Sequence, residues 1–227
     1  MKYLLYFLFC CLSLTSWGQV LETWAGTGGA GNTGDGGQAT AAEINYPLGG
    51  VFDKWGNYYF ALGATGNKIR KVTPNGIIST VAGTGNGSYS GDGGLAINAE
   101  LKNPQGLSVD TSGNIYIADS HNERIRKVDV ATGLIQTIAG TGSPGFSGDG
   151  GLAASAEISN PLDICTDRKG NIFIAESLNV RIRKIDKNGI ISTYAGTGTI
   201  GHSGDGGPAT AATIGPPWGI CSDDTGN

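Results

Sequence analysis

Short runs of residues that are either apolar or alternately apolar and polar recur along most of this chain. Between Gly106 and Gly140 there are four such runs, each about five residues long and bounded by Gly with Asp or Asn. They are residues 107–110, 115–118, 124–128 and 134–138. Short runs of this composition, separated by turn residues, predict β-strands rather than helices.

The segments between these runs have the composition of tight turns. Asp110 and Gly113 open and close the first connection, and Asp at the first turn position with a left-handed Gly suits a hairpin. The same spacing recurs at Asp53–Gly56, Asp167–Gly170 and Asp223–Gly226, and the third connection ends at Gly76, Gly133 or Gly189. Four antiparallel strands joined by hairpins describe one blade of a β-propeller.

The whole pattern repeats with a period of 57 residues. Two markers share this register, with spacings of 57, 57 and 56 residues. Ala-Gly-Thr-Gly begins at Ala25, Ala82, Ala139 and Ala195, and Gly-Asp-Gly-Gly begins at Gly34, Gly91, Gly148 and Gly204. The fold prediction is therefore all-β, a partial propeller of about 3.7 repeats of 57 residues. Alanines spaced by three before Pro161 suggest a short helical turn in the link between blades.

Composition narrows the fold class further. Gly supplies 40 of the 227 residues, and only 15% of residues are charged. Gly is a poor helix former, so a helical bundle or coiled coil is excluded, and the absence of a three-residue Gly period excludes collagen. The 39% of hydrophobic residues is enough to build a core, which argues against a disordered chain.

The N-terminus has the pattern of a secretory signal. Lys2 precedes an apolar run over residues 3–14, which is too short to span a bilayer, and Ser16-Trp17-Gly18 resembles a cleavage site. We expect residues 1–18 to be a signal peptide cleaved after Gly18, and residues 19–227 to form a secreted propeller domain without a transmembrane segment. The chain stops at Gly226-Asn227, a dipeptide that elsewhere opens a strand, which favours a truncated fragment.

The motifs of the second and third repeats resemble those of the NHL-repeat family of β-propellers. The matching segments are residues 103–110, 113–119, 122–129, 160–161, 170–176 and 179–186. The Ala-Gly-Thr-Gly and Gly-Asp-Gly-Gly insert is similar to that of secreted bacterial NHL proteins and of the teneurin propeller. This resemblance implies a full ring of about six blades and a binding role, but no particular reaction. The first repeat departs from it, because Leu62 replaces Asp119 and Lys68 replaces Arg124, so a salt bridge common to all repeats is not expected there.

One acidic residue of the Gly-Asp-Gly-Gly motif recurs in every repeat, and these residues are Asp35, Asp92, Asp149 and Asp205. Each carboxylate either accepts backbone N–H bonds that hold its own loop, or contacts a ligand or cation on one face. Neither an EF-hand nor a repeat-in-toxin calcium pattern is present, so calcium binding is unsupported and no cofactor is expected. Asp163 is a further candidate, because it replaces Gly49, Gly106 and Gly219 at the start of an inner strand.

Other motifs favour structural roles. The three Gly-x-Gly-x-x-Gly matches lack the βαβ context of a dinucleotide site. Arg124 and Arg126 are interpreted as strand cations paired with acids such as Asp119, and removal of Lys2 leaves a net charge of −5, which argues against nucleic acid. His121 and His202 occupy different repeat positions, which argues against a histidine-based metal site or catalytic base. Cys165 and Cys221 lie at equivalent points of neighbouring repeats and are expected to be small buried thiols rather than a disulfide.

Three classes of function remain. The favoured one is a secreted, non-enzymatic module for adhesion to, or binding of, a protein or a carbohydrate. The alternative is an enzyme on a six-bladed propeller, such as a metal-dependent lactonase or lyase, with its site in the missing blades. Asp163 is the residue in its favour. The third is an architectural array without a specific ligand.

Overall fold

The computed structural model describes residues 22–223, and these form an open arc of three β-sheets. Each sheet has four antiparallel strands in sequence order. The first sheet contains β1 (Pro47–Phe52), β2 (Tyr58–Leu62), β3 (Lys68–Val72) and β4 (Ile78–Ala82). The second contains β5 (Pro104–Val109), β6 (Ile115–Asp119), β7 (Arg124–Val128) and β8 (Ile135–Ala139). The third contains β9 (Pro161–Thr166), β10 (Ile172–Glu176), β11 (Arg181–Ile185) and β12 (Ile191–Ala195).

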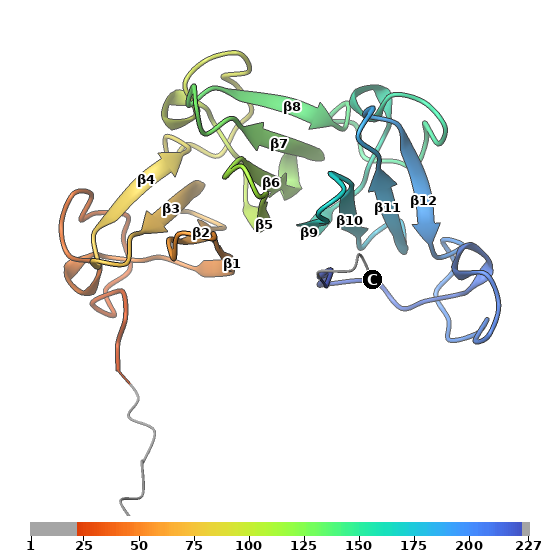
Figure 1. The fold of residues 1–227 in the computed structure, drawn as a ribbon, viewed down its shortest axis with the longest axis horizontal. Helices are drawn as coiled ribbons and strands as arrows, with labels where there is room; N and C mark the ends of the chain where they lie inside the picture. Colours follow the sequence, from red (N-terminus) through yellow and green to blue (C-terminus); the bar gives the residue numbers. More distant parts are fainter. Residues whose placement is uncertain (1–21, 224–227) are drawn as a thin grey trace, which may run out of the picture.

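These sheets are the blades of a partial propeller, and the fold prediction is confirmed. Figure 1 shows β1, β5 and β9 on the concave side of the arc and β4, β8 and β12 on its convex side. The arc does not close into a ring (Figure 1). Residues 216–223 belong to the fourth repeat and have no strand assignment. No helix within residues 22–223 is long and apolar enough to cross a membrane. The predicted signal peptide lies outside the described residues.

The hairpins form as the turn residues predict. In the second sheet, Gly113 has φ +93° and its N–H donates to the Asp110 carbonyl at 2.9 Å. The Asp110 carboxylate also accepts the backbone N–H groups of Ser112 and Asn114. Gly133 closes the β7–β8 turn with φ +72°. A residue with a Cβ is strained at such angles, which explains why Gly recurs at these positions.

The apolar core lies between neighbouring sheets. Ile69 of the first sheet and Ile117 of the second are fully buried in one cluster, together with Ala96 and Ala99 of the segment between the sheets. The second and third sheets share an equivalent cluster, which includes Ile125, Ile158 and Ile174. Each blade therefore depends on its neighbours for burial of its apolar faces.

We call the segments that follow the three sheets the links, and these are residues 83–103, 140–160 and 196–216. Residues 25–46 form the equivalent segment before the first sheet. Each of these four segments contains a single 3₁₀ turn, as the alanine spacing predicts: η1 (Ala39–Ala41), η2 (Ala96–Asn98), η4 (Ala153–Ser155) and η5 (Ala209–Ala211). The remaining turn, η3 (Ser120–Asn122), lies between β6 and β7. Each of the first three Gly-Asp-Gly-Gly loops forms backbone hydrogen bonds with the start of an outer strand. In the second blade, the Gly93 N–H donates to the Ile135 carbonyl at 2.8 Å. This pairing covers an otherwise open sheet edge.

Candidate functional site

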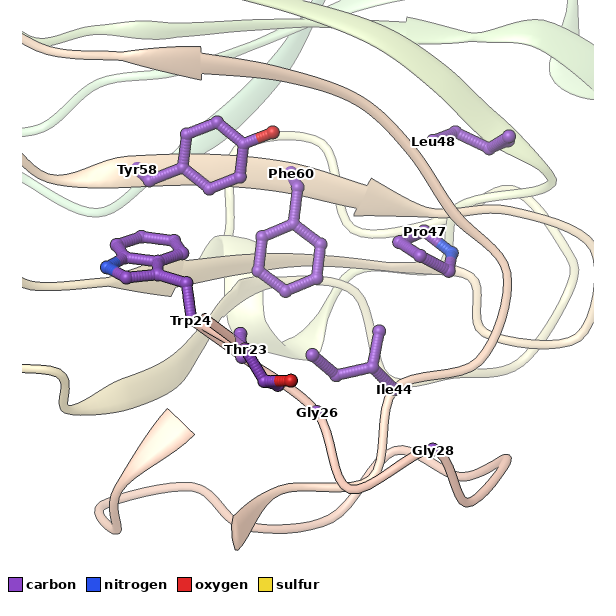
Figure 2. A pocket seen from close by; sticks show the side chains of 10 residues that line it. Thr23, Trp24, Gly26, Gly28, Ile44, Pro47, Leu48, Tyr58 and Phe60 are labelled. Atoms are coloured by element: carbon purple, nitrogen blue, oxygen red, sulfur yellow. The ribbon is translucent and has the colours of Figure 1, made fainter. Parts of the chain in front are cut away.

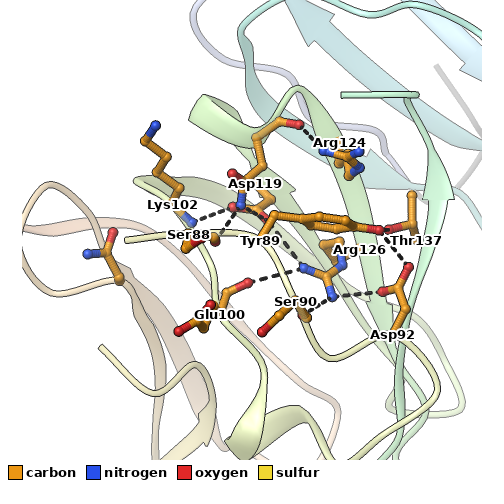
Figure 3. Close-up of polar contacts among 12 residues, drawn as sticks. Ser88, Tyr89, Ser90, Asp92, Glu100, Lys102, Asp119, Arg124, Arg126 and Thr137 are labelled. Carbon is orange, nitrogen blue, oxygen red and sulfur yellow. Dashed lines mark hydrogen bonds and ion pairs between the residues drawn. The ribbon is translucent and has the colours of Figure 1, made fainter. Parts of the chain in front are cut away.

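A fully buried arginine anchors each of the first three Gly-Asp-Gly-Gly loops. In the second blade, Arg126 Nη2 lies 2.7 Å from Asp92 Oδ1 and donates to the Ser90 carbonyl at 3.0 Å. Its Nη1 lies 3.3 Å from Asp119 Oδ2 (Figure 3). The Asp119 carboxylate also accepts the Lys102 N–H at 2.7 Å. One guanidinium therefore joins the link to the end of strand β6.

The third blade repeats this arrangement with conservative changes. Arg183 lies 2.5 Å from Asp149 and 3.5 Å from Glu176, and both Arg183 and Glu176 have fully buried side chains. The predicted pairing of strand arginines with acids at the end of the second strand is confirmed for Arg126 and Arg183. It is wrong for Arg124, which donates instead to the backbone carbonyls of Asn122 and Thr141.

The first blade lacks the second acid, as the sequence predicts. Arg70 is fully buried and pairs with Asp35 at 2.8 Å, but Leu62 stands at the position of Asp119. Arg70 Nη1 and Nε have no hydrogen-bond partner within residues 22–223. Burial accordingly lowers the pKa of Arg70, against the opposing effect of Asp35.

The structure separates the predicted site residues from one another. Asp35, Asp92 and Asp149 pair with buried arginines beside the outer part of their blades, whereas Asp163 lies on the inner strand β9. Asp205 makes no hydrogen bond or ion pair with another residue in 22–223. The prediction that these carboxylates accept backbone N–H groups is met in part, since Asp149 accepts the Thr193 N–H at 3.1 Å. Their pairing with buried arginines was not predicted. The signal was present, since Arg70, Arg126 and Arg183 recur with the same register.

Aromatic rings cover the buried arginines in two blades, which the sequence analysis also missed. The Arg124 guanidinium lies 3.7 Å from the Tyr89 ring centroid and that of Arg126 lies 4.9 Å from it. The Tyr89 hydroxyl donates to Asp92 at 2.9 Å (Figure 3). Phe146 stacks on Arg181 and Arg183 in the same way. These contacts add cation–π attraction to the ion pairs.

Burial dominates the ionisation of the two interior acids. Desolvation raises the pKa of Asp119 to about 6, against hydrogen bonds from Asn122 and the Lys102 backbone and the charge of Arg126. Desolvation likewise raises the pKa of Glu176 to about 7, and Arg183 and Asn179 oppose it. Both acids titrate at a pH well above that of an exposed carboxylate.

Asp163 lines a cavity of about 510 Å³ on the concave side of the arc, bounded by β1, β5, β9 and residues 220–222. Its carboxylate accepts the backbone N–H groups of Ile164 and Ile220, each at 2.9 Å, so it joins β9 to the fourth repeat. Burial raises the pKa of Asp163, and these two bonds oppose the shift. Asp163 is the sole charged residue among the described residues that line this cavity. Residues 22–223 contain no group of three or more His, Cys, Asp or Glu that could hold a metal ion.

The two cysteines differ in environment. Both are free, and Cys165 is buried whereas Cys221 is exposed. Burial raises the pKa of the Cys165 thiol to about 11. The expectation of two buried thiols is therefore correct for Cys165 and wrong for Cys221, which lies in the part of the fourth repeat that has no strand assignment.

A second hollow, the loop-face pocket, lies beside the turns that precede β7 and β11 and has a volume of about 440 Å³. Its apolar lining residues are Leu162, Leu178, Val180, Ile200, Pro216 and Trp218, and its polar ones are Gln105, His121, Asn160 and Ser177. Leu178, Ile200 and Trp218 are 70%, 67% and 77% exposed. The sequence did not predict this pocket, because its apolar residues match no known binding motif.

A third hollow lies on the uncovered face of the first blade. It has a volume of about 400 Å³ and is lined mainly by apolar residues, among them Trp24, Ile44, Tyr58 and Phe60 (Figure 2). The Trp24 and Tyr58 rings meet edge to face with centroids 5.3 Å apart. In the second blade the corresponding face is covered by the first blade.

Each of the three blades has four antiparallel strands and one buried arginine that pairs with the segment before its sheet. Blades that repeat in this way around an arc define part of a β-propeller. The profile of the family described as the teneurin NHL domain matches residues 26–90, 84–147 and 142–201. The chain belongs to this family, as the sequence motifs predict.

The chain is similar to a teneurin and to one further protein. Teneurin-1 of Mus musculus is 26% identical over an alignment that covers 74% of this chain and 9% of the mouse protein. "Protein SUPPRESSOR OF QUENCHING 1, chloroplastic" of Arabidopsis thaliana is 34% identical over 100 residues, which cover 44% of this chain and 9% of the plant protein. The chain thus spans about a tenth of the length of these relatives.

One solved structure supports the fold but carries no information on function. An auxiliary nutrient binding protein from Bacteroides ovatus superposes with a TM-score of 0.57 at 14% sequence identity. The similarity covers 81% of this chain and 44% of the Bacteroides protein.

Proposed function

We propose that this chain is part of a secreted, non-enzymatic NHL-repeat propeller that binds a protein or a carbohydrate. The observation that carries the proposal is the exposure of Leu178, Ile200 and Trp218 around one hollow. Clustered exposed apolar side chains with a polar rim are typical of interaction sites on soluble proteins. Membership of the teneurin NHL family and the predicted signal peptide favour a partner outside the cytoplasm.

The environment of the acidic residues supports binding rather than catalysis. Asp92 and Asp149 each pair with a buried arginine, which supports a structural role for these two carboxylates. Asp163 is held by two backbone N–H groups and has no histidine or second acid beside it among the described residues of the cavity wall. A metal site requires several ligand side chains close together, and residues 22–223 contain no such group.

The test is a binding screen with the full chain as secreted by its host. A glycan array and a panel of purified extracellular proteins, including a second sample of this chain, serve as candidate partners. We expect saturable binding to one class, weakened by Trp218→Ala and unaffected by calcium chelation. Parallel assays of lactone hydrolysis and lyase activity with Ca²⁺, Mg²⁺ and Zn²⁺ test the alternative. Metal-dependent turnover lost in Asp163→Asn would contradict the proposal.

A further inference from the structure

The loop-face pocket lies where a hydrogen bond that joins the earlier repeats is missing. In the first two repeats, the residue before the third strand accepts a backbone N–H from the residue before the next inner strand. Asn103 N donates to Asn67 Oδ1 at 2.8 Å. Asn160 N donates to Glu123 Oε2 at 2.5 Å. We call this contact the inter-repeat hydrogen bond.

The third repeat replaces both partners of the inter-repeat hydrogen bond at once. Val180 stands at the position of Glu123 and has no acceptor, and Pro216 stands at the position of Asn160 and has no N–H. Because donor and acceptor are lost together, neither remains buried and unpaired. The replaced pair lies instead on the apolar wall of the loop-face pocket.

The backbone of Val180 provides a second, independent observation. Val180 has φ +49°, the same left-handed conformation as Glu123 at +50° and Asn67 at +47°. A β-branched residue is an outlier in this region, and such strain concentrates at ligand-binding and other functional positions. Val180 is buried, so its side chain contributes to the pocket wall rather than to the outer surface.

The lining indicates the chemistry of the occupant. It contains no Asp, Glu, Lys or Arg among the described residues, so a charged ligand group would lose its hydration without a counter-charge. The aliphatic side chains of Leu162, Leu178 and Ile200 match an apolar side chain better than a hydroxyl-rich sugar, although Gln105, His121, Asn160 and Ser177 could pair with polar groups. At the rim, the Gln105 amide makes no hydrogen bond with another residue in 22–223, and it has both a donor and an acceptor to offer a peptide group.

We propose that the loop-face pocket binds an uncharged segment of a protein partner through one large apolar side chain, with Gln105 pairing to the segment's backbone. This inference deepens the proposed binding function and rests on it. A volume of about 440 Å³ falls within the range of small-ligand pockets, and is sufficient for one leucine or tryptophan side chain. Trp218 supplies an aromatic wall of the kind that dominates protein–protein hot spots.

The first test uses saturation-transfer NMR on the full chain with three probes: N-acetyl-L-leucinamide, N-acetyl-L-tryptophanamide and methyl β-D-glucopyranoside. We expect both amides to bind and the glucoside not to bind. Leu178→Ser should raise the dissociation constant of the amides about tenfold, which corresponds to loss of about 1.4 kcal/mol. Leu152→Ser is the matched control, because Leu152 is also exposed but lies outside the pocket, and it should leave the constant unchanged.

The second test rebuilds the inter-repeat hydrogen bond. The double variant Val180→Glu with Pro216→Asn copies the Glu123–Asn160 pair and places a carboxylate in the apolar wall. It should therefore abolish amide binding while the melting temperature does not fall. Preferential binding of the glucoside, or amide binding that persists in a folded double variant, would overturn the pocket assignment. If a partner from the screen binds with an affinity that Leu178→Ser leaves unchanged, this inference fails while the proposed function stands.

Discussion

Arg126 donates from Nη1 to Asp119 Oδ2 at 3.3 Å, and both side chains are fully buried. Removal of one partner from such a pair leaves a buried charge less well compensated. We expect Asp119→Ala to lower the free energy of unfolding by about 3 kcal/mol, measured from urea titration of the full chain. The double variant Asp119→Leu with Arg126→Met removes both charges and should recover most of this loss. A loss below about 1 kcal/mol in Asp119→Ala would contradict the assignment of Asp119 as an obligatory partner.

The raised pKa of Glu176 predicts an unusual pH dependence of stability. Burial raises its folded-state pKa from 4.5 to about 7, so the native state binds more protons than the unfolded state between these values. The contribution of Glu176 to the free energy of unfolding is therefore fully present below about pH 4.5 and is lost as the pH rises through about 7.

The variant Glu176→Gln isolates this effect from the other carboxylates. Free energies of unfolding measured at pH 5 and pH 7 should fall less with rising pH in Glu176→Gln than in the native chain. Glu157→Gln is the control, since Glu157 is not one of the fully buried acids. Equal pH dependence in the native chain and in Glu176→Gln would show that Arg183 keeps this acid ionised throughout.

The Gly-Asp-Gly-Gly loop predicts two different costs for the same substitution. Gly93 has φ +81°, and no atom lies within 4 Å of the position that a Cβ would occupy, so Gly93→Ala should cost about 1–2 kcal/mol from backbone strain alone. Gly91 has φ +91°, and a Cβ there would lie 2.7 Å from the Cα and Cβ of Ala99. Gly91→Ala should therefore be the more destabilising variant in urea titrations. Equal midpoints for the two variants would argue against this loop geometry.

The sequence predicts the fold well because its strongest signals are local. Asp110 and Gly113 define a hairpin through contacts within four residues, and the apolar runs beside them have the period of strands. The partial ring also follows, because the 57-residue period counts the blades directly. Hairpins and repeats of this kind require no knowledge of distant contacts.

The candidate site is less predictable because its contacts span a whole link. Asp92 and Arg126 are 34 residues apart, and no local pattern shows that the loop folds back onto β7. The loop-face pocket is harder still, since its signal is the loss of a bond. Val180 and Pro216 suggest no chemistry by themselves. Their significance is seen only by comparison with the equivalent residues Glu123 and Asn160, which form the hydrogen bond in the preceding repeat.

The two ends of the arc predict self-association of residues 19–227. Trp24 and Tyr194 are about half exposed on the outward faces of the first and third blades, whereas the equivalent faces between blades form buried clusters. Burial of apolar area stabilises by about 25 cal/mol per Å², so contact between these faces is favourable. We expect light scattering to show a concentration-dependent increase in mass and melting temperature. The double variant Trp24→Ser with Tyr194→Ser should reduce both, while Leu152→Ser should not. A monomer with a concentration-independent melt would show that the open arc is stable without cover on its end blades.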